Sequence, residues 1–220
     1  MSKRVSKQLN SFKYKGQPIK APAGTLALIC FCIVVLIVAT FTQLSLTPPS
    51  VLFNVMMGKT SLGISSAENV YRYIPQIPAL FFIIALLGRT YGILAIFSYI
   101  VLGMFFPIFA LGGGISYLWE YGFGYILAFI PAVFFTGTLL KIKTDFLRIV
   151  LMSVLGVITI HILGILYMLF VSALRHAQMD IVFSWIASQS GIQILYDIFF
   201  TIIAIYIGRF AKKIFWIIMC

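Results

Sequence analysis

The sequence predicts an all-α integral membrane protein with six transmembrane helices, a long outer loop after the first helix and a glycine-rich loop after the third. The 220 residues are 62% hydrophobic and only 10% charged, and the mean hydropathy is +1.09. A water-soluble fold of this size leaves too much surface exposed to hide that much apolar material. The apolar residues also gather in runs close to the roughly 20 residues with which a helix crosses a bilayer. These runs lack the period of two that a transmembrane barrel strand shows.

Six apolar segments are expected to form the helices. In chain order they are 24–44, 74–88, 91–106, 121–140, 146–172 and 190–208. The first follows basic residues, as in a signal peptide, but it is longer than a signal core and meets no small-residue cleavage site, so it should remain as an anchor. The second and third are short and are separated only by LLGRTYG. The chain is therefore divided into a basic cytoplasmic segment, 1–22, a six-helix membrane domain, 23–210, and a short cytoplasmic or interfacial tail, 211–220.

The basic residues predict how the helices are oriented. Of the 16 Lys and Arg residues, all but Lys59, Arg72 and Arg175 fall before the first expected helix or after the second, fourth and sixth. Since Lys and Arg collect in cytoplasmic connections, both termini should be cytoplasmic in a multi-pass protein of the plasma membrane. The net charge of +11 therefore reflects topology. The cations are dispersed over the connections rather than gathered on one face, which argues against a nucleic-acid partner.

The outer connections contain the most unusual sequence. Segments 45–73, 107–120 and 173–189 are long and are expected to lack regular structure, as lids and binding loops do, although the first could equally be a solvated linker. The stretch PIFALGGGISYLWEYGFGY, 107–125, begins with the second segment and places three consecutive glycines among many aromatic residues. Glycine permits positive φ and close approach, so this stretch suggests a bent loop beside a pocket for a small organic molecule. The alternatives are an exposed turn and aromatic anchors at the membrane interface.

Small residues indicate where helices pack closely. They recur every four positions in the fourth expected helix, at Gly124, Ala128, Ala132 and Thr136. This spacing puts them on one face, where a neighbouring backbone can approach. A second small pair, Ala23 and Ala27, begins the first helix.

The sequence offers few residues for chemistry. It contains no HExxH, no GxSxG, no phosphate-binding loop and no Cys/His cluster, so we expect no catalytic activity, no cofactor and no metal site. Asp197 is the exception, because a carboxylate inside a membrane helix usually faces a cavity or a partner. It could accept hydrogen bonds from a ligand, with Gln193 and Tyr196 beside it, or it could bond to His161 or Tyr167 of the preceding helix. His161 itself is expected to be a packing residue.

Several spaced motifs resemble the BioY family, the biotin-specific substrate-binding subunits (S components) of energy-coupling factor transporters, and cyanobacterial-type members in particular. The resemblance is strongest over YIPQIPALFFIIALLGRTYGILAIFSYIVLGMFFPIFALGGG and GFGYILAFIPAVFFTG. It implies a biotin site, a plasma-membrane location, and partnership with separate ATPase subunits and a membrane coupling subunit. The implied substrate-binding residues are Tyr99, Phe109, Gly112, Gly113, Gly114, Tyr125, Gln193, Tyr196 and Asp197. Ala23 and Ala27 resemble the small-residue motif with which S components meet the coupling subunit.

The chain also departs from the family pattern near the expected site. Many members have Lys three residues after the aspartate of the last helix, where this chain has Phe200. The usual Gly-Pro-Thr-Gly-Gly-Tyr reads EYGFGY, from Glu120 to Tyr125. Two other hypotheses therefore remain: an S component for a different vitamin or precursor, and a membrane scaffold or assembly protein without transport activity.

Overall fold

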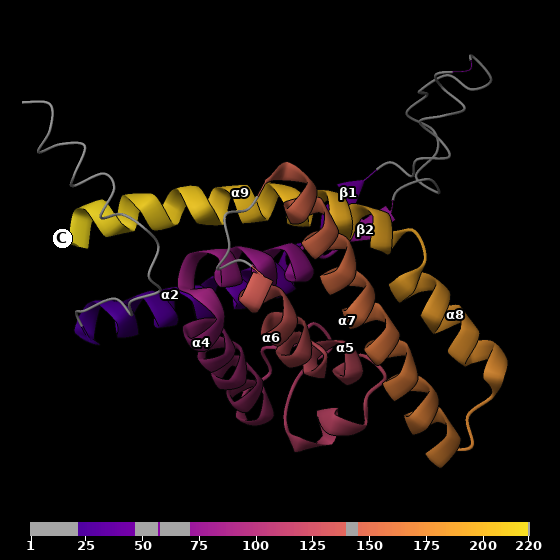
Figure 1. The fold of residues 1–220 in the computed structure, drawn as a ribbon. Coiled ribbons are helices and arrows are strands. Elements are labelled where there is room, and N and C mark those ends of the chain that lie inside the picture. The colour runs from indigo at the N-terminus through magenta and orange to yellow at the C-terminus, as the bar shows by residue number, and fades with distance from the viewer. Residues whose placement is uncertain (1–21, 47–56, 58–70, 140–144, 220) are drawn as a thin grey trace, which may run out of the picture.

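The computed structural model describes residues 22–46, 57, 71–139 and 145–219. Its helices are α2 (Pro22–Phe41), α4 (Gln76–Phe105), α5 (Phe123–Leu127), α6 (Phe129–Leu139), α7 (Phe146–Leu174), α8 (Met179–Ser190) and α9 (Gln193–Met219). A 3₁₀ helix, η2, spans Ile115–Trp119, and two short strands, β1 (Leu44–Leu46) and β2 (Tyr71–Tyr73), pair antiparallel. Figure 1 shows α2, the first part of α4 and α9 side by side, with α6 and α7 crossing beside them.

Four helical stretches are long and apolar enough to cross a membrane: Ala23–Phe41, Gln76–Phe105, Phe146–Leu174 and Met179–Phe215. Many of their large apolar side chains point outward, for example Leu26 and Val34 on α2 and Leu163 on α7. A soluble protein rarely exposes such continuous apolar surface, whereas lipid solvates it. The expectation of an all-α membrane protein is therefore confirmed, while the count of six spanning helices stays a prediction.

The second and third expected helices form one element that is broken at a glycine. Inside α4, Gly88 has φ 77° and ψ −175°, and no atom lies within 4 Å of the position where its Cβ would be. Glycine is therefore required there by backbone conformation rather than by space, because other residues rarely adopt positive φ. The next residue, Arg89, places its guanidinium 3.7 Å from the centre of the Phe134 ring on α6, a cation–π contact. Figure 1 shows α4 changing direction along its length.

The core lies around the first half of α4, which packs against α2 and α9, while α6 packs against α4 and α7. The small-residue face predicted for 121–140 is confirmed, since Gly124, Ala128, Ala132 and Thr136 are all buried. A Cβ on Gly124 would lie 2.7 Å from the Tyr167 ring on α7, so this glycine sets the distance between α5 and α7.

The structure corrects two expected boundaries. Segment 173–189 does not lack regular structure, because most of it belongs to α8. This helix is shorter and more polar than α7 and α9, so its composition did not mark it as a membrane helix. The predicted tail 211–220 continues α9 as far as Met219, since nothing in its sequence stops a helix. The middle of the predicted loop 45–73 lies outside the described residues except for Met57.

Candidate functional site

The glycine-rich loop folds back onto the C-terminal end of α4. Phe109 and Gly112 pair through two backbone hydrogen bonds of 2.8 and 3.0 Å, and the Gly114 amide donates to the Gly103 carbonyl at 2.9 Å. Gly112 and Gly114 have φ of 125° and 91°, which few other residues tolerate. Gly113 has ordinary φ but no room for a side chain, since its Cβ would lie 2.8 Å from the Gly103 oxygen. The sequence predicted a bent loop, and the described loop is bent.

Phe109 anchors this loop in the core. Its ring is fully buried and contacts Tyr99, Tyr117 and Phe123 at centroid distances of 5.4, 4.8 and 6.4 Å. Burial also raises the pKa of the Tyr117 phenol to about 12, so that ring stays neutral at physiological pH. Phe109, Tyr117 and Phe123 are therefore packing residues, whereas Phe105, Phe106 and Trp119 near the same loop are exposed.

Tyr99 belongs to a separate polar cluster between α2 and α4. Its hydroxyl accepts a hydrogen bond from the Gln76 amide at 3.0 Å and lies 3.1 Å from the Thr40 hydroxyl. Because Thr40 donates its proton to the Leu36 carbonyl, the Tyr99 hydroxyl is the donor to Thr40. The phenol of Tyr99 is thus satisfied by the protein itself.

A second polar chain converges on Asp197. The Tyr73 hydroxyl donates to Asp197 Oδ1 at 2.8 Å, and His161 Nε2 lies 3.2 Å from Asp197 Oδ2. The Ser190 hydroxyl lies 2.9 Å from His161 Nδ1 and 2.6 Å from the Tyr125 hydroxyl. Five elements, β2, α5, α7, α8 and α9, therefore meet at one buried network.

One assignment of protons satisfies every group in the network. With Asp197 ionised and His161 neutral, the carboxylate can only accept hydrogen bonds and His161 Nε2 is the donor to it. The Nδ1 atom of a neutral imidazole then has to accept, which makes Ser190 its donor and leaves Tyr125 as the donor to Ser190. Every hydrogen bond along this chain then points toward Asp197.

Aromatic residues line the same region of α9. The Tyr73 ring stacks on Phe200 at 5.3 Å and contacts Tyr196 at 5.8 Å. The Gln193 side chain, one turn before Asp197, also bonds to its carboxylate. Position 200, where the sequence departs from the family pattern, thus belongs to the aromatic wall beside the carboxylate.

The structure brings together four of the residues implied by the resemblance, Tyr125, Gln193, Tyr196 and Asp197. Tyr99 and Phe109 lie in the neighbouring cluster with the glycine loop. Of the two interpretations of Asp197, the bond to His161 is present, whereas Tyr167 instead donates to the Leu118 carbonyl.

Sequence reasoning did not assign Tyr73 or Ser190 to the site. Tyr73 begins the YIPQIP motif and Ser190 follows no motif, and each lies at the edge of an expected outer segment. His161, about four helical turns into α7, is expected from the sequence to be a packing residue, with a bond to Asp197 as the alternative. The search for a partner of the membrane aspartate is the signal that points to His161.

The carboxylate end of the Asp197 network is closed to solvent, while Ser190 and Tyr125 at its other end are half-buried. Asp197 and Tyr73 are 0% exposed and His161 is 2% exposed. Its outer cover consists of the β1–β2 ribbon, which provides Tyr73, and α8, in which Val182 is the buried residue. A cleft of about 520 Å³ lies elsewhere, between α5, α6 and α7. Its lining is almost entirely apolar, so it offers no partners for a polar ligand.

Within the described residues, no group of three or more His, Cys, Asp or Glu side chains is placed to hold a metal ion. The site instead consists of one carboxylate, an imidazole, hydroxyls and aromatic rings. Such a set is suited to binding a small molecule through hydrogen bonds and stacking.

Comparison with known proteins identifies the class. The fold is similar to that of the solved structure described as "Crystal structure at 2.1 A of the S-component for biotin from an ECF-type ABC transporter", with a TM-score of 0.60. The match covers 86% of this chain and 90% of that one at 18% identity. The BioY family model matches residues 72–216, so the chain belongs to the BioY family. A search of curated protein sequences found no significant match.

Proposed function

We propose that this chain is the substrate-binding subunit for biotin uptake, energised by separate ATPase subunits and a membrane coupling subunit. The buried network around Asp197 is the observation that supports biotin as the ligand. Membership of the BioY family supports a transport subunit rather than an enzyme.

The chemistry of biotin suits this network. Its ureido ring offers two N–H donors and one carbonyl acceptor, and Asp197 is an acceptor surrounded by hydroxyl donors. A carboxylate can accept about four hydrogen bonds, and the structure gives it Tyr73, His161 and Gln193 as partners. We propose that a ureido N–H takes a position on Asp197 and that a hydroxyl of Tyr73 or Tyr125 turns to the ureido carbonyl.

The remaining implied residues shape the surroundings of that position. Tyr196 and Phe200 provide an aromatic wall for the apolar tail of the ligand. We propose that Tyr99 and Phe109, whose rings contact each other at 5.4 Å, lie with Gly112, Gly113 and Gly114 at the far end of the ligand.

Ligand entry requires the outer cover to move. Since the carboxylate end of the network is closed, the β1–β2 ribbon or α8 has to separate from the bundle before biotin reaches Asp197. Both elements bury few residues against the bundle, since Leu44 and Ser45 of β1 are exposed and most residues of α8 are exposed. Such sparsely buried elements open at low cost.

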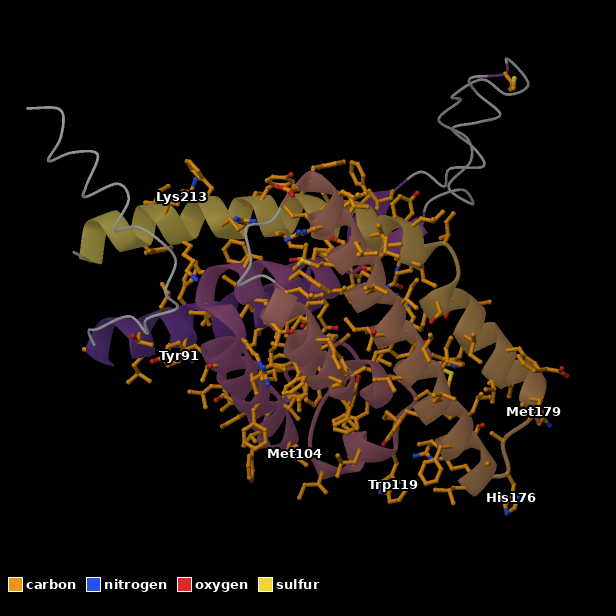
Figure 2. All side chains as sticks on the ribbon, viewed as in Figure 1. Tyr91, Met104, Trp119, His176, Met179 and Lys213 are labelled. Atoms are coloured by element: carbon orange, nitrogen blue, oxygen red, sulfur yellow. The ribbon has the colours of Figure 1, made fainter. Side chains whose placement is uncertain are left out.

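The orientation proposed from the charges has support in the arrangement of the helices. Figure 2 places Tyr91 and Lys213, which flank expected cytoplasmic segments, toward one end, and His176 and Met179 from an expected outer segment toward the other. Ala23 and Ala27 at the start of α2 are exposed, as a contact with the coupling subunit requires. Multiple crossings with both termini cytoplasmic form part of the proposal.

Calorimetry on the purified protein tests the function directly. Biotin should bind with release of heat and should raise the melting temperature, while an Asp197→Asn variant should bind about tenfold or more weakly, because a charge-assisted hydrogen bond contributes about 1.5–3 kcal/mol. If biotin produces neither heat nor stabilisation, the assignment is wrong. A panel of other vitamins then separates a different S component from a scaffold protein, for which no ligand would respond.

A further inference from the structure

The position of His161 suggests more than packing. It is the member of the network through which Ser190 and Tyr125 reach Asp197, and both of its ring nitrogens are engaged, at 2.9 Å and 3.2 Å. A ring held from both sides has a fixed orientation and a fixed tautomer. Gly164, one turn further on α7, would have its Cβ 2.5 Å from the Tyr125 ring, so the glycine allows Tyr125 to lie close to α7. The rings of Tyr125 and His161 meet edge to face at 5.7 Å.

We propose that His161 is a positioning residue for ligand recognition: Ser190 holds it as the Nε2–H tautomer, so that it keeps the Asp197 carboxylate oriented as an acceptor for ligand N–H groups. This inference rests on the proposed function, and it assigns to the site a preference for ligands that present ring N–H donors, as a cyclic urea does. His161 acts through Asp197 and need not touch the ligand.

The tautomer matters because the opposite one would be repulsive. If Nδ1 carried the proton, Nε2 would present a lone pair to the carboxylate 3.2 Å away. In the proposed arrangement the Ser190 hydroxyl favours the Nε2–H tautomer by donating to Nδ1, while the Tyr125 hydroxyl donates to Ser190. Loss of Ser190 would therefore weaken recognition at Asp197 through His161, to which the Ser190 hydroxyl bonds.

The groups facing this histidine come from several elements. Asp197 is on α9, Tyr125 on α5 and Ser190 at the end of α8. Among these, Asp197 is the charged partner, so the orientation of the network depends on a single carboxylate. A substitution of His161 should accordingly change how strongly the affinity depends on the N–H donors of the ligand.

Two substitutions of His161 can test the roles of its two ring nitrogens separately. In His161→Gln the side-chain amide can occupy the Nε2 position and still donate to Asp197. In His161→Asn the amide occupies the Nδ1 position and leaves Asp197 without this donor. The two variants are similar in polarity, so they differ mainly in which hydrogen bond survives.

The experiment measures the dissociation constants of biotin and of its two mono-N-methyl ureido derivatives. The readout is the dissociation constant of each methylated derivative divided by that of biotin, because the methyl group removes one N–H donor. In the wild type at least one derivative should bind about tenfold or more weakly. His161→Gln should retain this ratio within about threefold, whereas His161→Asn and Asp197→Asn should reduce it toward one.

Serine variants provide a matched pair that does not disturb the core. Ser190→Ala should reduce the ratio by about threefold or more. Ser188→Ala, on the exposed side of the same helix, where its hydroxyl bonds to the Trp185 carbonyl, should leave the ratio unchanged.

The results distinguish this inference from the proposed function. If the wild type binds no biotin, the proposed function fails. If the wild type binds but His161→Asn and Ser190→Ala weaken all three ligands equally, His161 is a packing residue and the inference is overturned. Melting temperatures measured without ligand identify a His161 variant that has lost its fold. In that event the ratio of dissociation constants in Ser190→Ala decides whether the inference holds.

Discussion

Replacing Gly113 with alanine tests the arrangement of the glycine loop. The added Cβ would lie 2.8 Å from both the Gly103 carbonyl oxygen and Pro107 Cα, and closer still to the Phe106 carbonyl oxygen. These are backbone atoms, so relief requires the loop to shift from the end of α4. Overpacking of this kind costs about 1–3 kcal/mol, and loss of the 2.9 Å hydrogen bond from Gly114 to Gly103 adds about 0.5–1.5 kcal/mol.

The expected destabilisation of Gly113→Ala is therefore about 2–4 kcal/mol. For a protein of this size, each kcal/mol lowers the melting temperature by about 2–4 °C, so a decrease of about 4–16 °C is expected. Thermal unfolding of detergent-solubilised protein, followed by tryptophan fluorescence or by loss of the monodisperse peak, measures it.

Gly92→Ala is the matched control. Gly92 is buried in α4 like a core residue, but its Cβ would lie 3.6 Å from the Val133 side chain, an ordinary contact. Alanine in a helix with room for it stabilises slightly, by about 0.4–1 kcal/mol. If Gly113→Ala melts as the wild type does, the close packing of the loop on α4 is wrong, and with it the reason given for this glycine.

Three further predictions concern packing, orientation and assembly. Gly124→Leu should lower the melting temperature by several degrees, because the new Cβ would lie 2.7 Å from the Tyr167 ring and α5 would be forced from α7; an unchanged melting temperature would contradict this. In a background without the three native cysteines, a membrane-impermeant maleimide applied to intact cells should label Met179→Cys and spare Lys213→Cys, and the reverse pattern would invert the topology. Ala27→Leu should leave biotin affinity within about twofold, since Ala27 is exposed, but should reduce co-purification with the coupling subunit; undiminished co-purification would remove Ala27 from that interface.

Much of the fold followed from local composition. The apolar runs predicted α2, α7 and the beginning of α9 within a few residues, because the bilayer demands a minimum length of uninterrupted apolar helix. The small-residue face at Gly124 and Ala128 was equally visible, since helical spacing alone puts such residues on one side. The sequence predicts a division at LLGRTYG, but whether the chain turns or continues there depends on the φ of Gly88, which the sequence does not specify.

The site was less predictable, because its members come from distant parts of the chain. Asp197 could be found as a carboxylate within an apolar run, since burial of charge is costly wherever it occurs. Tyr73 lies 124 positions away in sequence and donates to it only because β2 and α9 are adjacent. No motif connects Tyr73, Ser190 and His161, and each could have satisfied its polar atoms elsewhere.

The sequence by itself therefore determined that this is a helical membrane protein, and its spaced motifs indicated the family. These properties depend on composition and on local spacing, which the sequence contains without any knowledge of tertiary contacts. The tertiary structure decided which side chains meet Asp197 and that the glycines pack against the end of α4. Those outcomes depend on contacts between residues far apart in sequence, and the energy of a buried hydrogen bond exists only once both partners have been brought together.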